Sequence, residues 1–223
     1  MRKDKVQRRP AEIRPQVRSY RSVFVVLVIA GVVTGALYWH RWSAREAERQ
    51  TNNTANLTEC DAEFAVKVRT VLQGLETEGY RPWIRESWRS PLEQERAYLA
   101  GRSEIRLGFH NVTGRNGEHR AFAVDVVERM DGARAKPRYA VTLARLASAS
   151  DLQTGISWGL MDWEQRAVER AVQTQSLPVN EYLKLGWDPC HLEPRNLTLK
   201  EALERAGATG GATAPPSTPP TAR

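Results

Sequence analysis

The chain has 223 residues, which allows one ordinary domain plus extensions. Its formal net charge is +7 and its isoelectric point is about 9.7, values that are common among nucleic-acid-binding proteins. However, eight Lys or Arg precede Ser22, against only Asp4 and Glu12, and the rest of the chain is close to balanced. A basic N-terminus next to an apolar run indicates membrane topology and argues against a nucleic-acid partner.

Residues 22–39 form an uncharged apolar run of 18 residues, near the lower limit for crossing a bilayer. Tyr38 and Trp39 suit a membrane interface, and the basic residues before the run are typical of the cytoplasmic side. We therefore expect residues 1–21 to be a cytoplasmic tail and residues 22–39 to be a single-pass anchor in the inner membrane. All that follows would be periplasmic or otherwise extracytoplasmic. The alternative is a cleaved signal peptide, but no A-x-A-like cleavage site follows the run.

The segment after the apolar run is polar, and we interpret residues 40–57 as a stalk. The folded domain is expected over residues 58–206. Thr58 is a good N-cap for its first helix, and Gly79 is a natural end for that unit. Residues 207–223 consist mainly of Ala, Thr, Gly and Pro, too poor in apolar side chains to fold, so we expect a disordered tail.

Local patterns inside the domain predict both helices and strands. Residues 82–88 alternate as a strand does, and Ser90 and Glu93 form a capping box at the start of a helix. Residues 107–113 and 120–127 are β-like, and the Asn-Gly between them is the strongest short hairpin signal. Helices are further predicted over 91–100, 138–149, 163–175 and 199–206, and a tight turn over 188–191. The pattern indicates an α+β fold, a small antiparallel sheet with flanking helices carrying a zinc site, preceded by the transmembrane helix.

The most informative stretch reads GWDPCHLE and contains His191, with Asp188 three residues before it. Upstream, Asp125 ends the strand-like sequence AVD, and two further histidines precede it. Two His and one Asp would leave one of the four zinc positions open, which is the arrangement of catalytic zinc sites. The sequence therefore predicts a metallohydrolase with Zn²⁺ as cofactor.

His110 and His119 compete for the position of the second histidine ligand. If residues 120–125 form a straight strand, His119 and Asp125 lie about 20 Å apart and cannot share one ion. If the Asn-Gly turn closes a hairpin, His110 returns to the neighbourhood of Asp125. This geometry favours His110, while His119 stays the alternative.

Three motifs, the middle one in two halves, resemble those of the zinc peptidases of bacterial cell walls, namely the VanY-like D-alanyl-D-alanine carboxypeptidases and the phage L-alanyl-D-glutamate endopeptidases. Their pattern is Arg-Ser-x-x-x-Gln, then Ser-x-His-x-x-Gly-x-Ala-x-Asp, then Asp (or Glu)-x-x-His. The matching segments here are WRSPLEQ at 88–94, GFHNVT at 108–113, AVD at 123–125 and DPCH at 188–191. The likeness covers residues 64–193. It departs from the pattern at the extra stretch 114–122, which splits the middle motif.

The resemblance implies a role for each matching residue. The zinc ligands would be His110, Asp125 and His191. Asp188 would be the general base that takes a proton from the attacking water; the alternative is a turn-capping Asp. Arg89 would stabilise the developing oxyanion or bind a substrate carboxylate, unless it forms only a surface ion pair. Gln94 would assist substrate binding by orienting groups around the metal, or would face solvent.

The resemblance also implies a membrane-anchored hydrolase that cuts peptidoglycan stem peptides, as a carboxypeptidase or as an L-Ala-D-Glu endopeptidase. Gly31 and Gly35 lower the hydrophobicity of the anchor, which fits a phage endolysin whose helix can leave the membrane. The strongly apolar residues 23–29 fit a resident envelope enzyme. The alternative from another class is a non-catalytic cell-wall-binding scaffold on a degenerate peptidase fold, which the split middle motif favours.

Two further sets of residues allow two interpretations each. Cys60 and Cys190 can pair as a disulfide in an exported domain, or stay as two unpaired thiols. Trp158, Trp163 and Trp187 can line a substrate groove, but a place in the buried core is expected for most of them.

Overall fold

The computed structural model describes residues 18–101, 103, 105–128, 135–177 and 183–207. It divides into two compact units, Met1–Glu48 and Arg49–Arg223. Most of the expected basic tail and nearly all of the expected disordered tail lie outside the described residues. The second unit starts at Arg49, upstream of the domain boundary that the sequence predicts.

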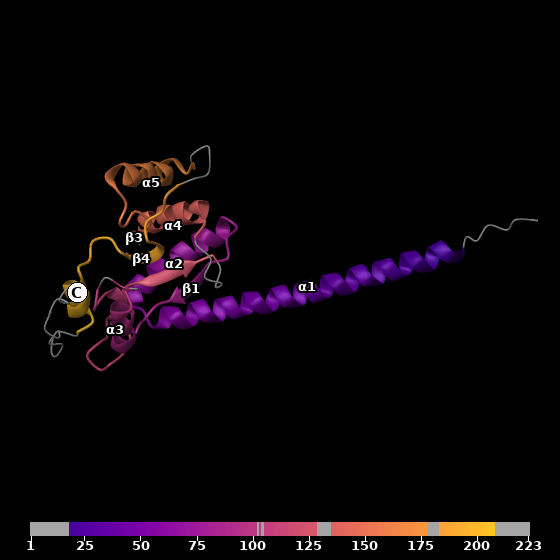
Figure 1. The fold of residues 1–223 in the computed structure, drawn as a ribbon. Coiled ribbons are helices and arrows are strands. Elements are labelled where there is room, and N and C mark those ends of the chain that lie inside the picture. Colours follow the sequence, from indigo (N-terminus) through magenta and orange to yellow (C-terminus); the bar gives the residue numbers. More distant parts are fainter. Residues whose placement is uncertain (1–17, 102, 104, 129–134, 178–182, 208–223) are drawn as a thin grey trace, which may run out of the picture. The chain divides into compact units, whose positions relative to one another are not determined.

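The first element is a continuous helix, α1, Arg18–Thr58 (Figure 1). In the described part of the chain, it is the one helix long and apolar enough to cross a membrane, and no residue of its most apolar stretch is buried. By length and composition it fits an anchor or a signal sequence. The expected stalk is helical throughout. Thr58 ends this helix, so the prediction that it caps the next one was wrong. The cap of α2 is Asp61, whose carboxylate accepts hydrogen bonds from the backbone of Glu63 and Phe64.

Four strands form one antiparallel sheet, which confirms the α+β expectation. In chain order they are β1 Trp83–Glu86, β2 Val124–Val127, β3 Leu152–Gly155 and β4 Asp188–Pro194. Their order in the sheet is β1-β2-β4-β3, and every pairing is antiparallel. The tight turn predicted over 188–191 was wrong, because these residues begin β4, an interior strand. The sequence reading also missed β3, whose four residues carry no distinct strand pattern.

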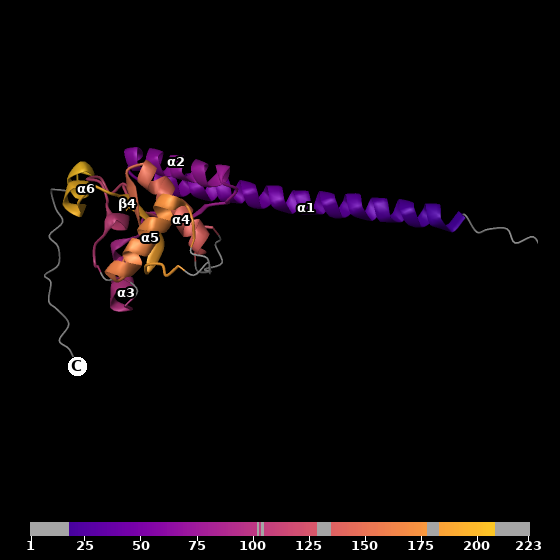
Figure 2. The same ribbon diagram turned by 90° about the horizontal axis from the view of Figure 1, so that it is seen from above.

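Helices cover one face of this sheet and leave the other face for polar residues. Besides α1, the helices are α2 Ala62–Thr77, α3 Pro91–Leu99, α4 Pro137–Ala149, α5 Asp162–Thr174 and α6 Leu199–Arg205. Apolar side chains of α2 and α4 pack on the sheet residues Ile84, Val124, Val126, Leu152 and Leu192. A second cluster joins α4 to α5, so α4 lies between α5 and the sheet (Figure 1), and α5 crosses over α4 in the view from above (Figure 2).

The segment predicted as a hairpin has an irregular backbone. The strand predicted over 107–113 was wrong: a short 3₁₀ helix, η1 Phe109–Asn111, stands there. Asn111 explains the difference, because its side chain accepts from Gly108 N (2.9 Å) and donates to the carbonyl of Arg89 (2.8 Å). The predicted turn does form, with Gly117 at φ +84° and a bridge between Thr113 and His119. The chain therefore returns toward β2 although most of the expected ladder is absent.

Cys60 and Cys190 are free, buried thiols, so the disulfide that the sequence allowed is absent. Cys60 pairs with Ala121 in an isolated bridge, whereas Cys190 belongs to β4 next to His191. Burial, with nearby carboxylates, raises the pKa of each thiol to about 12. Both side chains therefore belong to the apolar core.

Candidate metal centre

The polar face of the sheet carries a row of side chains that touch one another across the four strands. Side chains alternate along a strand, so a residue and its opposite number on the next strand share a face. The register places Asp125 of β2 opposite His191 of β4. It also places Gln153 of β3 opposite Glu193 of β4. Regular pairing thus brings a carboxylate and an imidazole together.

Asp125 is almost fully buried, with 3% of its surface exposed. Its Oδ2 accepts a hydrogen bond from Arg85 Nη2 at 2.7 Å. Among the described residues no hydrogen-bond donor is aligned with Oδ1, although His191 Nδ1 lies 3.3 Å away and His110 Nε2 3.6 Å away. Burial opposes ionisation, but the two imidazoles outweigh it and hold the pKa of Asp125 well below its usual value. The result is a buried carboxylate oxygen that faces two histidines.

His191 is held from the other side by a second carboxylate. Its Nε2 lies 3.1 Å from Glu193 Oε2, and Glu193 Oε1 accepts from Gln153 Nε2 at 2.7 Å. Burial lowers the pKa of His191, but its contacts with Asp125 and Glu193 raise it to about 9 in the metal-free protein. These contacts turn Nδ1 of the ring toward Asp125.

His110 reaches the same point from η1. Its Nδ1 lies 2.5 Å from the backbone carbonyl of Ser87, which leaves Nε2 directed at His191 Nδ1, 3.3 Å away. The backbone carbonyl of His110 accepts from the backbone N–H of Arg89 at 2.9 Å, and the carbonyl of Phe109 accepts from Phe122 at the same distance. These hydrogen bonds fix the loop, so the stretch inserted after η1 does not separate the histidine from β2.

Three ligand atoms therefore converge: His110 Nε2, Asp125 Oδ1 and His191 Nδ1, all within 4.8 Å of one another. The other polar atom of each side chain is held by Ser87, Arg85 or Glu193, as is usual for metal ligands. A buried carboxylate oxygen without an aligned donor, facing two ring nitrogens, suits a cation. Two nitrogens and one oxygen are a donor set that zinc accepts, and three protein ligands leave one coordination position open. The residues present fit a metal ion.

His119 does not belong to this cluster. Its ring stacks on Trp88 with centroids 3.6 Å apart and planes 8° apart, and its Nδ1 lies 3.5 Å from Glu59. The side chain is 38% exposed. Of the two competing histidines, the structure brings His110 to Asp125 and keeps His119 at the surface.

Asp188 lies at the edge of the cluster. Its Oδ2 is 3.9 Å from His191 Nδ1, and its side chain is 25% exposed. In a regular strand a residue three positions from His191 would point to the opposite face. Here the register shifts between Thr154 and Gly155, which places Asp188 opposite Gly155. A Cβ on Gly155 would stand 2.3 Å from the Asp188 carbonyl, so only glycine permits this approach. Burial and the charge of Asp125 raise the pKa of Asp188.

Arg89 is fixed by two neighbours. Glu86 binds its Nε at 2.6 Å and also its Nη2, and Gln94 Oε1 accepts from Nη1 at 2.7 Å. Gln94 is buried, and its Nε2 donates to Ser103 and to the Ile105 carbonyl. Gln94 therefore does not face solvent, and its side-chain oxygen holds Arg89. The predicted capping box of Ser90 begins the helix that carries Gln94.

Sequence reasoning missed Arg85 and Ser87, which hold the outer atoms of Asp125 and His110, and Gln153, which binds Glu193. Arg85 lies on β1, and Gln153 lies on β3, which was not predicted. Ser87 contacts His110 only through its backbone carbonyl. The alternation of β1 places Arg85 on the face opposite the buried Ile84, and this was the one available signal.

The tryptophans separate into different environments. The Trp158 ring lies 5.1 Å from the His191 ring and 5.1 Å from the Trp187 ring. Trp187 is 57% exposed and Trp163 is 60% exposed, so the expectation of a buried core was wrong for these two. Trp158 and Trp187 thus form an aromatic pair beside the candidate ligand His191.

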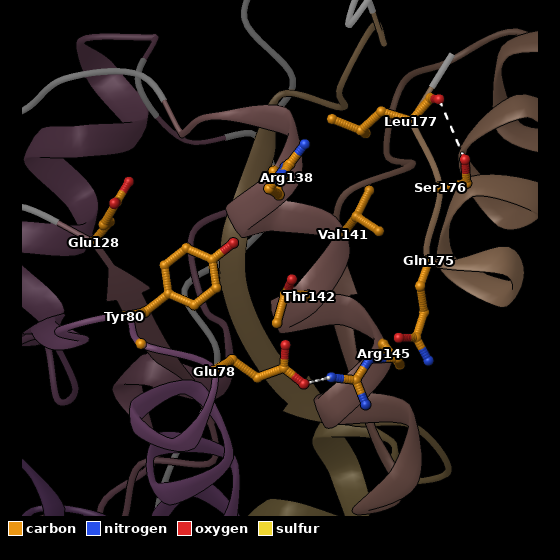
Figure 3. A pocket seen from close by; sticks show the side chains of 11 residues that line it. Glu78, Tyr80, Glu128, Arg138, Val141, Thr142, Arg145, Gln175, Ser176 and Leu177 are labelled. Carbon is orange, nitrogen blue, oxygen red and sulfur yellow. Dashed lines mark hydrogen bonds and ion pairs between the residues drawn. The ribbon is translucent and has the colours of Figure 1, made fainter. Parts of the chain in front are cut away.

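A pocket of about 750 Å³ lies elsewhere in the domain, lined mainly by residues just after α2, by α4 and by residues just after α5 (Figure 3). Glu78 and Arg145 form an ion pair of 2.6 Å at its wall, and Tyr80 lines it. Its lining includes none of the three converging ligands. The pocket and the candidate metal site are therefore separate.

Comparisons of the chain with models of protein families, with curated protein sequences and with solved structures find no match. What the site can do follows from its own geometry.

Proposed function

We propose that this chain is a membrane-anchored zinc peptidase that hydrolyses peptide bonds in the stem peptides of peptidoglycan. The observation that carries the proposal is the convergence of His110 Nε2, Asp125 Oδ1 and His191 Nδ1 on one point. The sequence resemblance to cell-wall zinc peptidases names the same three residues. When bound there, zinc would supply a Lewis acid and would lower the pKa of water.

Asp188 is the proposed general base. Its carboxylate borders both the ligand cluster and solvent, at 3.9 Å from His191 Nδ1. From there it would accept the proton of the attacking water and later give a proton to the leaving amine.

Arg89 is the proposed cation for the developing oxyanion or for a substrate carboxylate. Glu86 and Gln94 hold its guanidinium without using every N–H, so each terminal nitrogen keeps one donor. A guanidinium fixed before the substrate arrives loses little freedom on binding it. We interpret Glu86 and Gln94 as the residues that orient this cation.

The location follows from α1. We propose that its apolar part anchors the protein in the inner membrane, with the basic tail inside and the zinc domain in the periplasm or outside. Peptidoglycan lies on that side of the membrane. The bond cut would be the terminal D-Ala linkage or the L-Ala-D-Glu linkage, in a resident envelope enzyme or in a phage endolysin.

The test combines metal content with product analysis. Full-length protein in detergent should contain about one zinc per chain and should release peptides from purified peptidoglycan, with His110→Ala as the inactive control. Mass spectrometry of the fragments distinguishes free D-alanine from peptides that begin with D-Glu. A wild-type protein without zinc and without products would contradict the proposal and favour the non-catalytic wall-binding scaffold.

A further inference from the structure

Among the described residues, no strand lies beside the outer edge of β1, because β1 is the first strand of the sheet. Side chains from the C-terminal end of α1 take the place of that strand. Asn53 accepts from Ile84 N at 2.7 Å and donates to the Pro82 carbonyl at 2.9 Å. Asn52 donates to the Ile84 carbonyl at 2.7 Å, and Arg49 donates to the Pro82 carbonyl at 3.0 Å. A helix thus satisfies the backbone groups that an edge strand would otherwise expose.

These contacts are buried. Arg49 is 1% exposed and Asn53 is 4% exposed. Arg49 also pairs with Glu76 at 2.7 Å, so its buried charge is compensated. A guanidinium and an amide are costly to bury unless their partners are always present. The burial indicates that this part of α1 is a permanent component of the domain.

Ser87 connects the same helix end to the metal site. Its Oγ lies 2.9 Å from Asn56 Oδ1 and 2.6 Å from Glu59 Oε2. Its backbone carbonyl lies 2.5 Å from His110 Nδ1. The residue that orients the ring of His110 is therefore held by side chains at and just after the end of α1.

We infer that residues 49–59 help to position the metal ligands. They close the edge of β1, and through Ser87 they fix the orientation of His110. Asn53 and Ser87 are positioning residues in this arrangement, since neither reaches the metal ligands with its side chain. The consequence for metal binding rests on the proposed function, whereas the closure of the β1 edge does not.

Asn53→Leu in the full-length, metal-free protein tests the closure of the edge. The change leaves the buried Ile84 amide without its acceptor, so the unfolding equilibrium constant should rise by about tenfold or more. Hydrogen exchange at the Ile84 amide should accelerate. Thr54→Leu is the matched control, because Thr54 is the next residue and is exposed. Unchanged exchange at Ile84 in the Asn53 variant would overturn the inference.

Ser87→Ala tests the connection to His110. The variant keeps the carbonyl but loses the hydroxyl that Asn56 and Glu59 hold, so the zinc Kd should rise about tenfold, the low end for outer partners of metal ligands. The absorption spectrum of the cobalt-substituted protein should also shift, which a loss of stability alone would not cause. Thr70→Ala, on the exposed side of α2, is the control.

An unchanged zinc Kd and cobalt spectrum in Ser87→Ala would reduce residues 49–59 to a purely structural role and overturn the connection. A wild-type chain that binds no zinc would overturn the proposed function and the connection together. The exchange rate of Ile84 would still decide whether the helix closes the sheet.

Discussion

Asp125 and His191 lie directly opposite each other on neighbouring antiparallel strands, with Asp125 Oδ1 3.3 Å from His191 Nδ1. Opposed residues of such strands share a face, so the register alone brings these two ligands together. A slip of one residue would turn Asp125 toward the core. His110 differs, because it depends on a loop that hydrogen bonds hold in place.

Replacing any one ligand should remove the metal. His110→Ala, Asp125→Ala and His191→Ala should each lose zinc and activity, since two remaining protein ligands hold zinc poorly. Elemental analysis of the purified variants measures zinc per chain. His119→Ala should keep zinc, because His119 stacks on Trp88 outside the cluster. Loss of zinc from the His119 variant, with retention in the His110 variant, would reverse the assignment.

Asp188→Asn should separate metal binding from turnover. The amide is nearly isosteric and should leave the zinc content unchanged. Turnover should fall by at least about a hundredfold, the low end for removal of a general base. Steady-state hydrolysis of a stem peptide measures this fall. Full activity of the Asp188→Asn variant would mean that another carboxylate is the general base.

Glu193→Ala should act mainly on metal affinity. Glu193 holds the outer nitrogen of His191 at 3.1 Å, so its removal should weaken zinc binding by about 10–100-fold. Competition with a chelator gives the zinc Kd. Glu169→Ala, exposed on α5, is the control. Unchanged affinity with lost turnover would instead identify Glu193 as the base.

Zinc removal should lower the thermal stability of the domain. At free zinc about a hundred times the Kd, binding to the native state adds about 2.7 kcal/mol. For a domain of this size that corresponds to a Tm higher by about 5–10 °C. Calorimetry with and without a chelator measures the difference. The same chelator should leave the Tm of His191→Ala unchanged, and a shift in that variant would point to zinc at another site.

Protease added to spheroplasts should digest the zinc domain and spare the short basic tail, because positive residues stay in the cytoplasm. Immunoblotting with antibodies against each end of the chain measures which part is digested. A domain that is protected until the cells are lysed would contradict the proposed orientation.

Fractionation after depolarisation of the membrane tests whether the helix can leave the bilayer. A resident enzyme stays in the membrane fraction, whereas a signal-arrest-release endolysin appears in the soluble fraction at full length. We expect the resident behaviour.

Much of the fold follows from short-range signals in the sequence. The capping box at Ser90 and Glu93 begins α3 as predicted. The apolar periodicity before Gly79 correctly indicates α2, whose first turn is capped by Asp61 and not by Thr58. Helix caps and helical periodicity act within a few residues, so they can be read without knowing the rest of the molecule.

The candidate ligand set was also accessible from the sequence, since the pattern of two His and one Asp restricted the choice to His110 or His119. The tertiary structure shows which of the two lies beside Asp125 and His191. The deciding contacts join distant parts of the chain: the Ser87 carbonyl to His110, and the Phe109 carbonyl to Phe122. No local pattern encodes a hydrogen bond between two loops.

Other features were decided by tertiary structure alone. β3 is a strand because it pairs with the edge of β4 that β2 does not occupy. The register shift at Gly155 turns Asp188 toward His191. Arg49 lies in a polar stretch of sequence that resembles a linker. It is nevertheless buried, because its guanidinium donates to the Pro82 carbonyl at the edge of β1. Strand pairing and edge closure depend on neighbours remote in the sequence. The sequence by itself therefore determined the apolar helix, most of the helices and the candidate ligands. Only the folded sheet determined which of these side chains meet.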